Sequence, residues 1–585
     1  FNHSLGGDFN VPAAGGWEHL SEQLQGVGRS GGYETVDASG HSARADSDRR
    51  FMFGGGPARR FVAEMNPSGI EAYQIIPGGY GGDSAAAAGT VQLGRWLTNR
   101  YRRIPLQLSE IEAQQTAEFT LVPDSYGLQF PFFQGDSQFF TAIAVVNRVA
   151  SNLEMEFTAW SPSGSLLEFP ENPRLVELPP GRQWARLGGE IFGIAPTDPQ
   201  SGWIELKLTS SDGEPPSVGS FTQFGDFELR QLDGATAVQS ASRLLYFPRV
   251  FEGPAAVLGQ ASGTWISVAN PGVGPVQMTI EFVPLESTGS SSRERLAVDR
   301  ELNSKGVLFE RLSELFDVAE LPLGYLRVVV TEGEGVVGFE LIRLLESGTL
   351  IGVNGLPSGA TRKLYSAQMA IAETVFTNVS LINTSEFDRT VGLRFLPQGG
   401  GGALEASPLQ LSPGQSVQFD PSALLPIDSV PQSGSSPSSV PLVGSLEIRI
   451  DGPGVIGDVL FGDPDTLKFG AALPLQSQPF QEAIFGHVAN LGQFFTGVAL
   501  FNPNAETAEV KLEVFSSEGE LKGTKNLSLA AGDRLSQVLT ELVSESANQA
   551  GGYIRVTSDR GIIGQELFGT MDLRLQSAVP PTVEK

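Results

Sequence analysis

Histidines are the first residues to test for chemistry, because an imidazole can serve as a general base or a metal ligand near neutral pH. His3, His19 and His41 lie near the start of the chain, but their spacing matches no compact metal-ligand pattern. His487 stands alone among strand-forming residues in IFGHVAN, and no spacing brings it together with a serine and an acid as a triad. We therefore interpret His487 as a packed or surface side chain and assign none of these histidines to catalysis or metal binding.

Carboxylates in turns are the next candidates, because calcium prefers oxygen ligands. Asp46 and Asp48 lie in RADSDRR, and Asp463 and Asp465 lie in GDPDT. Neither segment continues as the acidic loop with a distant glutamate that an EF-hand uses, so we interpret both as solvated turns. The glycine-rich segments GGPARR and PGGYGGD lack the Lys-Ser/Thr ending of a phosphate-binding loop. The sequence thus predicts no catalytic, cofactor-binding or metal-binding residue in this chain.

The composition excludes several classes of protein. The 585 residues include no cysteine, which excludes disulfides, thiolate metal sites and cysteine nucleophiles. The net charge of -27 repels phosphate backbones and argues against a nucleic acid partner. No apolar run is long enough to span a membrane, no export signal is visible, and Phe1 indicates a processed or cut end. With 70 glycines, 38 prolines and only 18% charged residues, the chain favours short strands and turns over long helices.

A strand-like segment that ends in asparagine occurs four times, and this repeat is the strongest signal in the sequence. The copies FFTAIAVVN, TWISVAN, VFTNVSLIN and FFTGVALFN end at Asn147, Asn270, Asn383 and Asn502. An asparagine side chain at a strand end can hydrogen-bond the backbone of the next turn, and the residue tolerates a left-handed backbone. We therefore predict that these asparagines cap turns and do not form a binding series.

Each copy continues with the same succession of predicted elements. An alternating strand comes first, such as VQMTIEF from Val276 to Phe282, in which every second residue is apolar. A glycine-centred turn follows, then a stretch with helical character such as FERLSELF, a strand that opens with glycine, and a closing hairpin strand such as VVGFELI. The turn glycines are Gly181, Gly306, Gly414 and Gly532, and the strand-opening glycines are Gly202, Gly324, Gly444 and Gly552.

About seven short strands per copy, with turn signals roughly every 8–12 residues, are typical of an antiparallel β-sandwich of immunoglobulin or fibronectin III type. A barrel is the alternative. We predict sandwiches at residues 118–242, 243–361, 362–477 and 478–585. The joins between them are short, so we expect a semi-rigid rod whose neighbouring units touch. Low-complexity segments such as STGSSSRE and SVPQSGSSPSSVP lie inside the units and predict long loops at the sandwich ends.

Residues 1–117 contain no copy of the repeat, and their clearest predicted strands are RRFVAEM and AYQIIPGG. The order FNHSLGGDFNVPAAGGW, GGYETVDASG, FGGGPARRFVAEM, IEAYQIIPGGYGGD and QLGRWLTNRY, within residues 1–107, resembles the C-terminal part of the penicillin acylase family of N-terminal-nucleophile amidohydrolases. The matching residues are Glu34, Thr35, Val36, Arg59, Arg60, Pro77, Gly78, Gly79, Gly81, Gly82, Gln92, Trp96 and Tyr101.

The resemblance implies a fold and a reaction. In the family, a Ser, Thr or Cys at the N-terminus of the mature β-chain attacks an amide carbonyl, and its own amino group acts as the base. That nucleophile, the oxyanion residues and the calcium ligands of some members lie upstream of the matched segment, so none of these roles falls on this chain. Gly81, Gly82 and Asp83 stand where the family continues Ser-Gly-Asn, and the later His-Tyr pair is missing. Residues 1–117 are therefore expected to form an α+β segment that completes an αββα body together with an upstream segment or a partner chain.

Two functions follow from the sequence. The first is the non-catalytic C-terminal part of a secreted N-acyl amide hydrolase, whose immunoglobulin-like domains serve surface attachment or assembly, with any amidohydrolase activity carried by the upstream or partner chain. The second is an extracellular structural protein, such as a surface-layer, filament or adhesive-stalk subunit, with a degenerate acylase-derived domain. Both place the chain outside the cell or in the periplasm, with self-assembly through sandwich edges as one mode of association. The sequons at Asn2, Asn378, Asn383 and Asn526 permit glycosylation if the source adds it.

Overall fold

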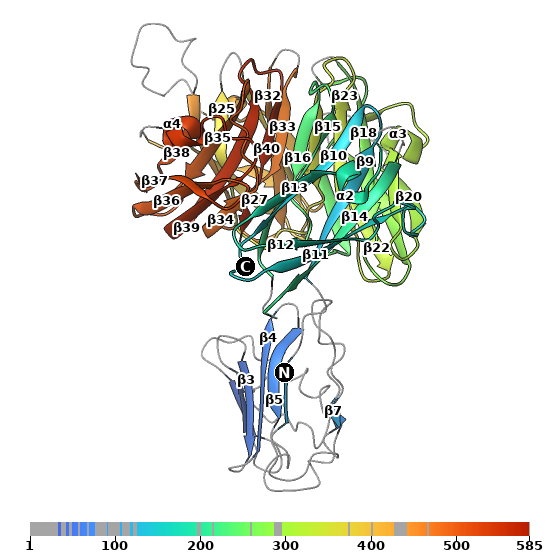
Figure 1. Ribbon diagram of the computed structural model, residues 1–585. Coiled ribbons are helices and arrows are strands. Elements are labelled where there is room, and N and C mark those ends of the chain that lie inside the picture. The colour runs from blue at the N-terminus through green and yellow to red at the C-terminus, as the bar shows by residue number, and fades with distance from the viewer. Residues whose placement is uncertain are drawn as a thin grey trace. The chain divides into compact units, whose positions relative to one another are not determined.

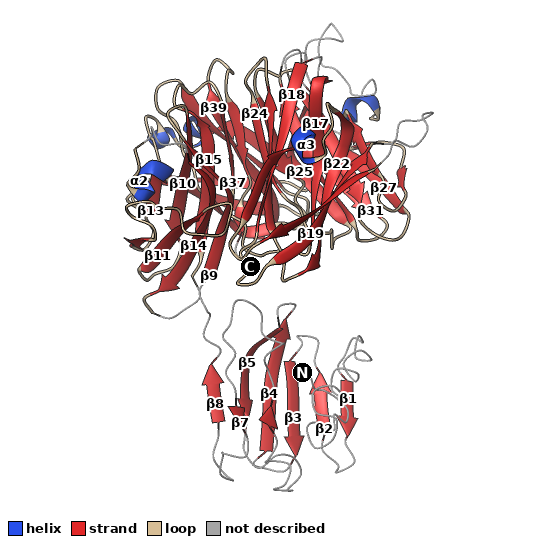
Figure 2. Cartoon of the chain, turned by 90° about the vertical axis from the view of Figure 1, so that its right-hand side faces the viewer, coloured by secondary structure: helices blue, strands red, loops and turns tan. Residues whose placement is uncertain are grey.

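The computed structural model describes residues 126–583 apart from 196–199, 213–215, 258–259, 286–294, 372–374, 399–401, 426–441 and 465–466, and it also describes eight short strands before them. The protein is mainly β, with 61% of residues in strands and 4% in helices, and its sheets are antiparallel, which confirms the predicted class. The chain divides into two compact units, Phe1–Tyr126 and Gly127–Lys585 (Figures 1 and 2). Among the described residues, no helix is long and apolar enough to cross a membrane.

The first unit contains an antiparallel sheet in the order β1-β2-β3-β4-β5-β8. The strands are β1 (Tyr33–Val36), β2 (Ser42–Ala45), β3 (Arg50–Gly55), β4 (Arg59–Asn66), β5 (Gly69–Ile75), the separate pair β6 (Thr90–Val91) and β7 (Leu106–Gln107), and β8 (Ala117–Thr120). β4 and β5 are the two strands predicted from RRFVAEM and AYQIIPGG. β8, which begins at the predicted boundary of residue 117, pairs with β5 of this unit. The matched residues Gln92, Trp96 and Tyr101 lie outside the described residues.

The second unit repeats one strand pattern four times. Strand positions that we name a to h in chain order form two four-stranded antiparallel sheets in the first copy, and the other copies keep the same order of neighbours. The two sheets are joined through β17 and β18 in the second copy and through β39 in the fourth, whose outer sheet also gains β41. In the third copy, strand d is divided into β28 and β29. The outer sheet has the order d-c-f-a, and the inner sheet has the order e-b-g-h. The strands of the second, third and fourth copies lie within residues 243–361, 362–477 and 478–585.

The first copy contains β9 (Tyr126–Gly135), β10 (Phe139–Asn147), β11 (Leu153–Trp160), β12 (Arg174–Leu178), β13 (Gln183–Leu187), α2 (Gly188–Phe192), β14 (Gln200–Ser210), β15 (Val218–Asp226) and β16 (Leu232–Ala235). The second contains β17 (Leu244–Val257), β18 (Gln260–Ala269), β19 (Val276–Pro284), β20 (Leu296–Leu302), β21 (Val307–Arg311), α3 (Leu312–Leu315), β22 (Leu321–Glu332), β23 (Val337–Leu344) and β24 (Leu350–Asn354).

The third copy contains β25 (Lys363–Ile371), β26 (Phe376–Asn383), β27 (Arg389–Pro397), β28 (Leu404–Glu405), β29 (Leu409–Leu411), β30 (Ser416–Phe419), the 3-10 helix η4 (Pro421–Ala423), β31 (Leu442–Ile450), β32 (Val455–Gly462) and β33 (Gly470–Pro474). The fourth contains β34 (Phe480–Phe485), β35 (Phe494–Phe501), β36 (Ala508–Phe515), β37 (Leu521–Leu529), β38 (Arg534–Val538), α4 (Leu539–Leu542), the 3-10 helix η6 (Ser544–Ser546), β39 (Tyr553–Thr570), β40 (Gln576–Val579) and β41 (Thr582–Val583).

Outer and inner sheets differ in their burial. In β19 of an outer sheet, Val276 and Met278 are buried whereas Gln277 is exposed, as the alternation predicts for a sheet with one wet face. In β32 of an inner sheet, all eight residues are buried. One face of each inner sheet packs within its own copy; in the second copy, Ile266 and Val268 of β18 contact the outer sheet. The opposite face, equally apolar, must therefore be covered by another copy.

The four copies close into a ring, and the predicted rod is wrong. Neighbouring copies share apolar clusters, and the fourth copy also packs on the first, where Phe568 and Val579 meet Phe140 and Phe221. At the centre, β16 and β33 each contact both β24 and β40, so the four h strands surround one axis. Three of these strands, β16, β33 and β40, are labelled near one another in Figure 1. A rod would separate the first copy from the fourth. The short joins fit either arrangement, but only the ring covers both faces of every inner sheet.

An aromatic residue at the start of strand f bridges three of the four junctions. Trp203, Tyr325 and Tyr553 each follow the strand-opening glycine and donate a hydrogen bond to a backbone carbonyl in the turn before strand e of the next copy. The acceptors are Lys305, Gly414 and, across the closing junction, Gly181, at 2.7, 2.8 and 2.9 Å. The recurring strand-opening glycines therefore lie on one side of each of these junctions, and the recurring glycine-centred turns lie on the other side.

The strand order differs from that of a constant immunoglobulin domain. There the last two strands lie in the same sheet. Here strands f and g belong to different sheets; in the fourth copy they are the single strand β39, which pairs with β36 in the outer sheet and with β35 in the inner sheet. An eighth strand, h, follows at the ring centre. Strand h was not counted among the roughly seven strands predicted per copy, because it is only four or five residues long and closely follows a turn.

Candidate functional site

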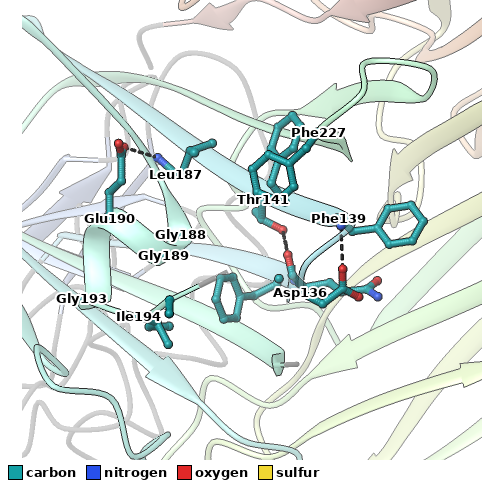
Figure 3. Close-up of a pocket in the computed structure, with 15 residues that line it drawn as sticks. Asp136, Phe139, Thr141, Leu187, Gly188, Gly189, Glu190, Gly193, Ile194 and Phe227 are labelled. Atoms are coloured by element: carbon teal, nitrogen blue, oxygen red, sulfur yellow. Dashed lines mark hydrogen bonds between the residues drawn. The ribbon is translucent and has the colours of Figure 1, made fainter. Parts of the chain in front are cut away.

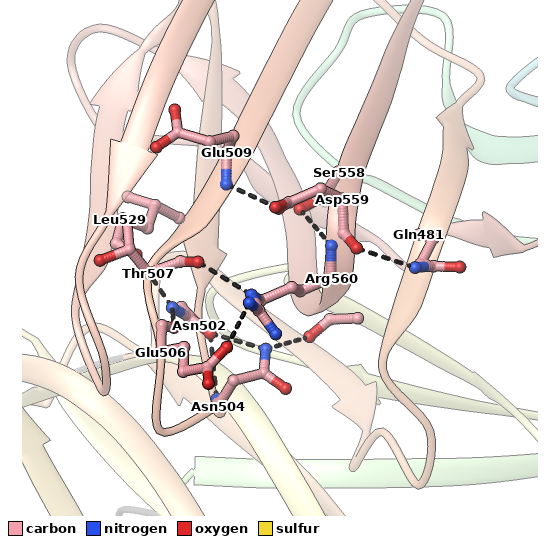
Figure 4. A network of polar contacts seen from close by, with 11 residues as sticks. Gln481, Asn502, Asn504, Glu506, Thr507, Glu509, Leu529, Ser558, Asp559 and Arg560 are labelled. Atoms are coloured by element: carbon pink, nitrogen blue, oxygen red, sulfur yellow. Dashed lines mark hydrogen bonds and ion pairs between the residues drawn. The ribbon is translucent and has the colours of Figure 1, made fainter.

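The four repeated asparagines are buried turn caps, as predicted. In each, the side-chain amide nitrogen donates to the carbonyl four residues on and to a carbonyl at the end of strand d, and Oδ1 accepts from the N–H two residues on. For Asn502, the partners are Glu506, Leu529 and Asn504, at 2.8, 2.9 and 3.0 Å (Figure 4). None of the four has a positive φ angle. Their role is architectural.

The left-handed backbone lies instead in the turn before strand e. Gly181, Gly414 and Gly532 have φ angles of 69°, 73° and 73°. In the second copy the left-handed residue is Lys305, with φ 61°, and not the predicted Gly306. The lysine is held there by an ion pair, because its Nζ lies 2.9 Å from Oε1 of Glu205 in the first copy.

His487 is a packed residue, as predicted. The centroid of its ring lies 4.4 Å from that of Phe568 and 5.4 Å from that of Phe221, and its Nε2 is buried without a hydrogen-bond partner. Burial lowers the pKa of His487 to about 4, so the imidazole is neutral near pH 7. The imidazole fills part of the junction between the first and fourth copies.

The other motif residues form no site among the described part of the chain. Asp463 accepts a hydrogen bond from the N–H of Lys468 at 3.4 Å, whereas Asp465 lies outside the described residues. The same is true of His3, His19, His41, Asp46, Asp48 and Asn2. No cluster of three or more His, Asp or Glu side chains that could hold a metal occurs among the residues that the structure describes.

The asparagines of the sequons differ in their exposure to solvent. Asn383 is fully buried by its turn contacts, and Oδ1 of Asn378 accepts from Nη1 of Arg249 at 2.6 Å. Asn526 is exposed on β37.

A buried carboxyl group at the ring centre was not predicted from the sequence. Asp233 of β16 accepts a hydrogen bond from the hydroxyl of Ser577 on β40 at 2.5 Å and from the N–H of Gly352 on β24 at 2.6 Å. Three copies therefore meet at one side chain. Burial raises the pKa of Asp233 to about 7.

Charged residues buried inside strands form a second group that was not predicted; Glu340, Asp458 and Glu566 lie in g strands, and Arg249 lies in β17, an a strand. Arg249 of the second copy forms a bidentate pair with Asp458 of the third, with Nη2 2.8 Å from Oδ1 and both side chains 1% exposed. Burial, together with the charge of Asp458, raises the pKa of Glu340 well above its usual value. Burial also raises the pKa of Glu566, whose carboxyl oxygens have no hydrogen-bond partner. A charged residue between apolar residues of a strand-like segment was the available signal.

A cavity of about 500 Å³ opens between the turn that joins β9 to β10 and helix α2 (Figure 3). Its apolar lining comprises Phe133, Phe139, Phe140, Leu187, Ile194 and Phe227. The two acids of the lining serve local turns: Asp136 accepts from the N–H of Phe139 at 2.7 Å, and Glu190 accepts from the N–H of Leu187 at 3.0 Å. A cavity of this size and lining suits a ligand with an apolar body.

A smaller cavity of about 160 Å³ adjoins the first at the junction of the first and second copies. Gln134, Phe139 and Phe140 line both cavities. The remaining lining residues are Phe132, Phe224, Gly225, Trp265, Phe309, Leu341, Arg343 and Leu350. Arg343 is the cationic side chain of this lining.

Comparison with known proteins assigns no relative: neither a family model nor a curated protein matches the chain.

Proposed function

We propose that this chain is the non-catalytic C-terminal part of an exported, penicillin-acylase-like N-acyl amide hydrolase, in which residues 127–585 form a rigid platform. The observation that supports the platform is the closed ring, in which both faces of every inner sheet are buried. A body closed in this way resists hinge motion, because opening one junction exposes apolar area on two copies. The absence of cysteine and the acidic surface are in keeping with an exported protein.

The relation to the acylases rests on the order of matched segments within residues 1–107. In this proposal, residues 1–117 complete an αββα body with an upstream segment or partner chain that holds the nucleophile and any calcium. The four copies are variant immunoglobulin-like sandwiches whose last strands have moved to the ring centre.

The proposal is tested on the protein produced from its full reading frame. Intact mass should reveal a second chain that begins with Ser, Thr or Cys, and the complex should hydrolyse a chromogenic N-acyl amide. Replacement of that first residue by alanine should abolish turnover, and residues 1–585 by themselves should show none. A reading frame without such a residue would refute the acylase assignment.

The alternative is an extracellular assembly subunit with a degenerate acylase-derived domain. It is favoured by the outer edge strands, such as β37, whose nine residues have no pairing partner on one side among the described residues. Lys522 and Lys525 on β37 oppose strand addition by their charge, so assembly would need an acidic partner strand. Light scattering of the purified chain distinguishes the two proposals, since only the assembly-subunit proposal requires the chain to form oligomers.

A further inference from the structure

The second copy departs from the repeat at one pair of facing residues. In the other three copies, a phenylalanine of strand b lies opposite a glycine of strand g. The pairs are Phe140–Gly225, Phe376–Gly462 and Phe495–Gly569. In the second copy, Gly263 takes the place of the phenylalanine and Arg343 that of the glycine.

The exchange places an arginine at the smaller cavity. On the inner sheet of the first copy, Phe140 is buried in the apolar cluster that joins this copy to the fourth. The equivalent face of the second copy looks toward the first. There the ring of Trp265 covers Gly263, since a Cβ on this glycine would lie 2.8 Å from that ring. The aromatic residues around this position, Phe132, Phe224, Trp265 and Phe309, enclose the space of about 160 Å³. Arg343 enters the lining from strand g.

The guanidinium of Arg343 is an unpaired cation in an acidic protein. Its Nε is buried without a hydrogen-bond partner, and Arg343 forms no ion pair among the residues that the structure describes. Its guanidinium lies near an aromatic face, with Cζ 5.5 Å from the ring centroid of Phe139. The neighbouring Arg311, in contrast, is paired with Glu252 at 2.8 Å. A partly desolvated cation without a counter-ion is costly, and an incoming anion would relieve that cost.

We propose that the two adjoining cavities bind an amphipathic monocarboxylate, that is, an acid with an apolar chain. The planar fork of Arg343 matches a carboxylate, which it can hold by two parallel hydrogen bonds. The apolar chain lies along Phe139 and Phe140 into the larger cavity, whose volume is within the range of small-molecule sites. The site belongs to the ring and does not depend on the acylase relation of residues 1–117.

The test is isothermal titration calorimetry of the whole chain with octanoate, 1-octanol and acetate. Octanoate is expected to bind saturably at one site per chain. 1-Octanol, which has the same chain without the charge, is expected to bind about tenfold or more weakly, because hydrogen bonds to a charged group are the strong ones. Acetate, which has the charge without the chain, is expected to give no saturable heat. Equal affinity for octanoate and 1-octanol, or no octanoate binding, would overturn the proposal without any variant.

Variants locate the site. Arg343→Gln is expected to reduce octanoate affinity about tenfold, to the level of 1-octanol, and Arg343→Lys should recover part of it. The matched control is Arg389→Gln in the third copy, since Cζ of Arg389 also lies 5.5 Å from an aromatic ring centroid, that of Phe387, and Arg389 lines neither cavity. The control should bind octanoate like the unmodified protein. A folded Arg343→Gln protein, judged by an unchanged thermal transition, that keeps full octanoate affinity would refute the role of Arg343.

Discussion

At the scale of single residues, the repeated asparagines show how one side chain can fix a turn. Each satisfies two backbone carbonyls and one N–H that would otherwise be buried without partners. We predict that Asn383→Ala lowers the free energy of unfolding by about 2–3 kcal/mol, because the freed backbone groups stay buried. The measurement is the midpoint of urea unfolding. Asn526→Ala, at an exposed position, is the control and should leave the midpoint unchanged; equal effects would contradict the capping role.

Asp233 should make the ring less stable as the pH rises. Its pKa is 3.8 when unfolded and about 7 when folded, so the folded state binds more protons between these values. The contribution of Asp233 is therefore fully present below about pH 3.8 and is lost as the pH rises through about 7. We predict that Asp233→Asn raises the melting temperature at pH 8 relative to the parent and by less at pH 5. A difference that does not change with pH would contradict this.

The contribution of His487 to the pH dependence of stability has the opposite sign to that of Asp233. Its pKa falls from 6.5 to about 4 on folding, so the unfolded state binds the extra proton, and stability is lost as the pH falls from about 6.5 toward 4. We predict that His487→Phe makes the melting temperature less sensitive to pH in this range. Unfolding monitored at pH 4, 5 and 7 measures it, and an unchanged slope would show that another group dominates.

At the scale of elements, the junctions depend on the start of strand f. Tyr325 and Tyr553 make the same hydrogen bond, one between the second and third copies and the other between the fourth and first. We predict that Tyr325→Phe and Tyr553→Phe each lower stability by about 1 kcal/mol, the usual net value of a hydrogen bond. Chemical unfolding of the two variants in parallel is the measurement. An effect of Tyr325→Phe without one of Tyr553→Phe would mean that the fourth copy does not close on the first.

At the scale of the whole molecule, closure of the ring predicts cooperative unfolding. Each inner sheet is covered by two neighbours, so the loss of one copy exposes apolar faces on two others. We predict that residues 127–585 melt in a single calorimetric transition and that Tyr553→Ala lowers that transition as a whole. Hydrogen exchange should then increase in the second and third copies, which Tyr553 does not touch. Exchange that increases only in the first and fourth copies would indicate independent units.

The sequence by itself determined the local elements of the second unit. The period-two alternation, the capping asparagines and the short helices α3 and α4 depend on neighbours within one copy, and these were predicted from the residues. Only the tertiary structure decided the ring, the cavity at Arg343 and the buried acid at Asp233. Asp233 and Ser577 are 344 residues apart in the chain, and Arg249 and Asp458 are 209 apart. The sequence of a wholly apolar strand predicts that both of its faces are buried. It does not predict what covers the second face, because that partner depends on how the four copies pack against one another.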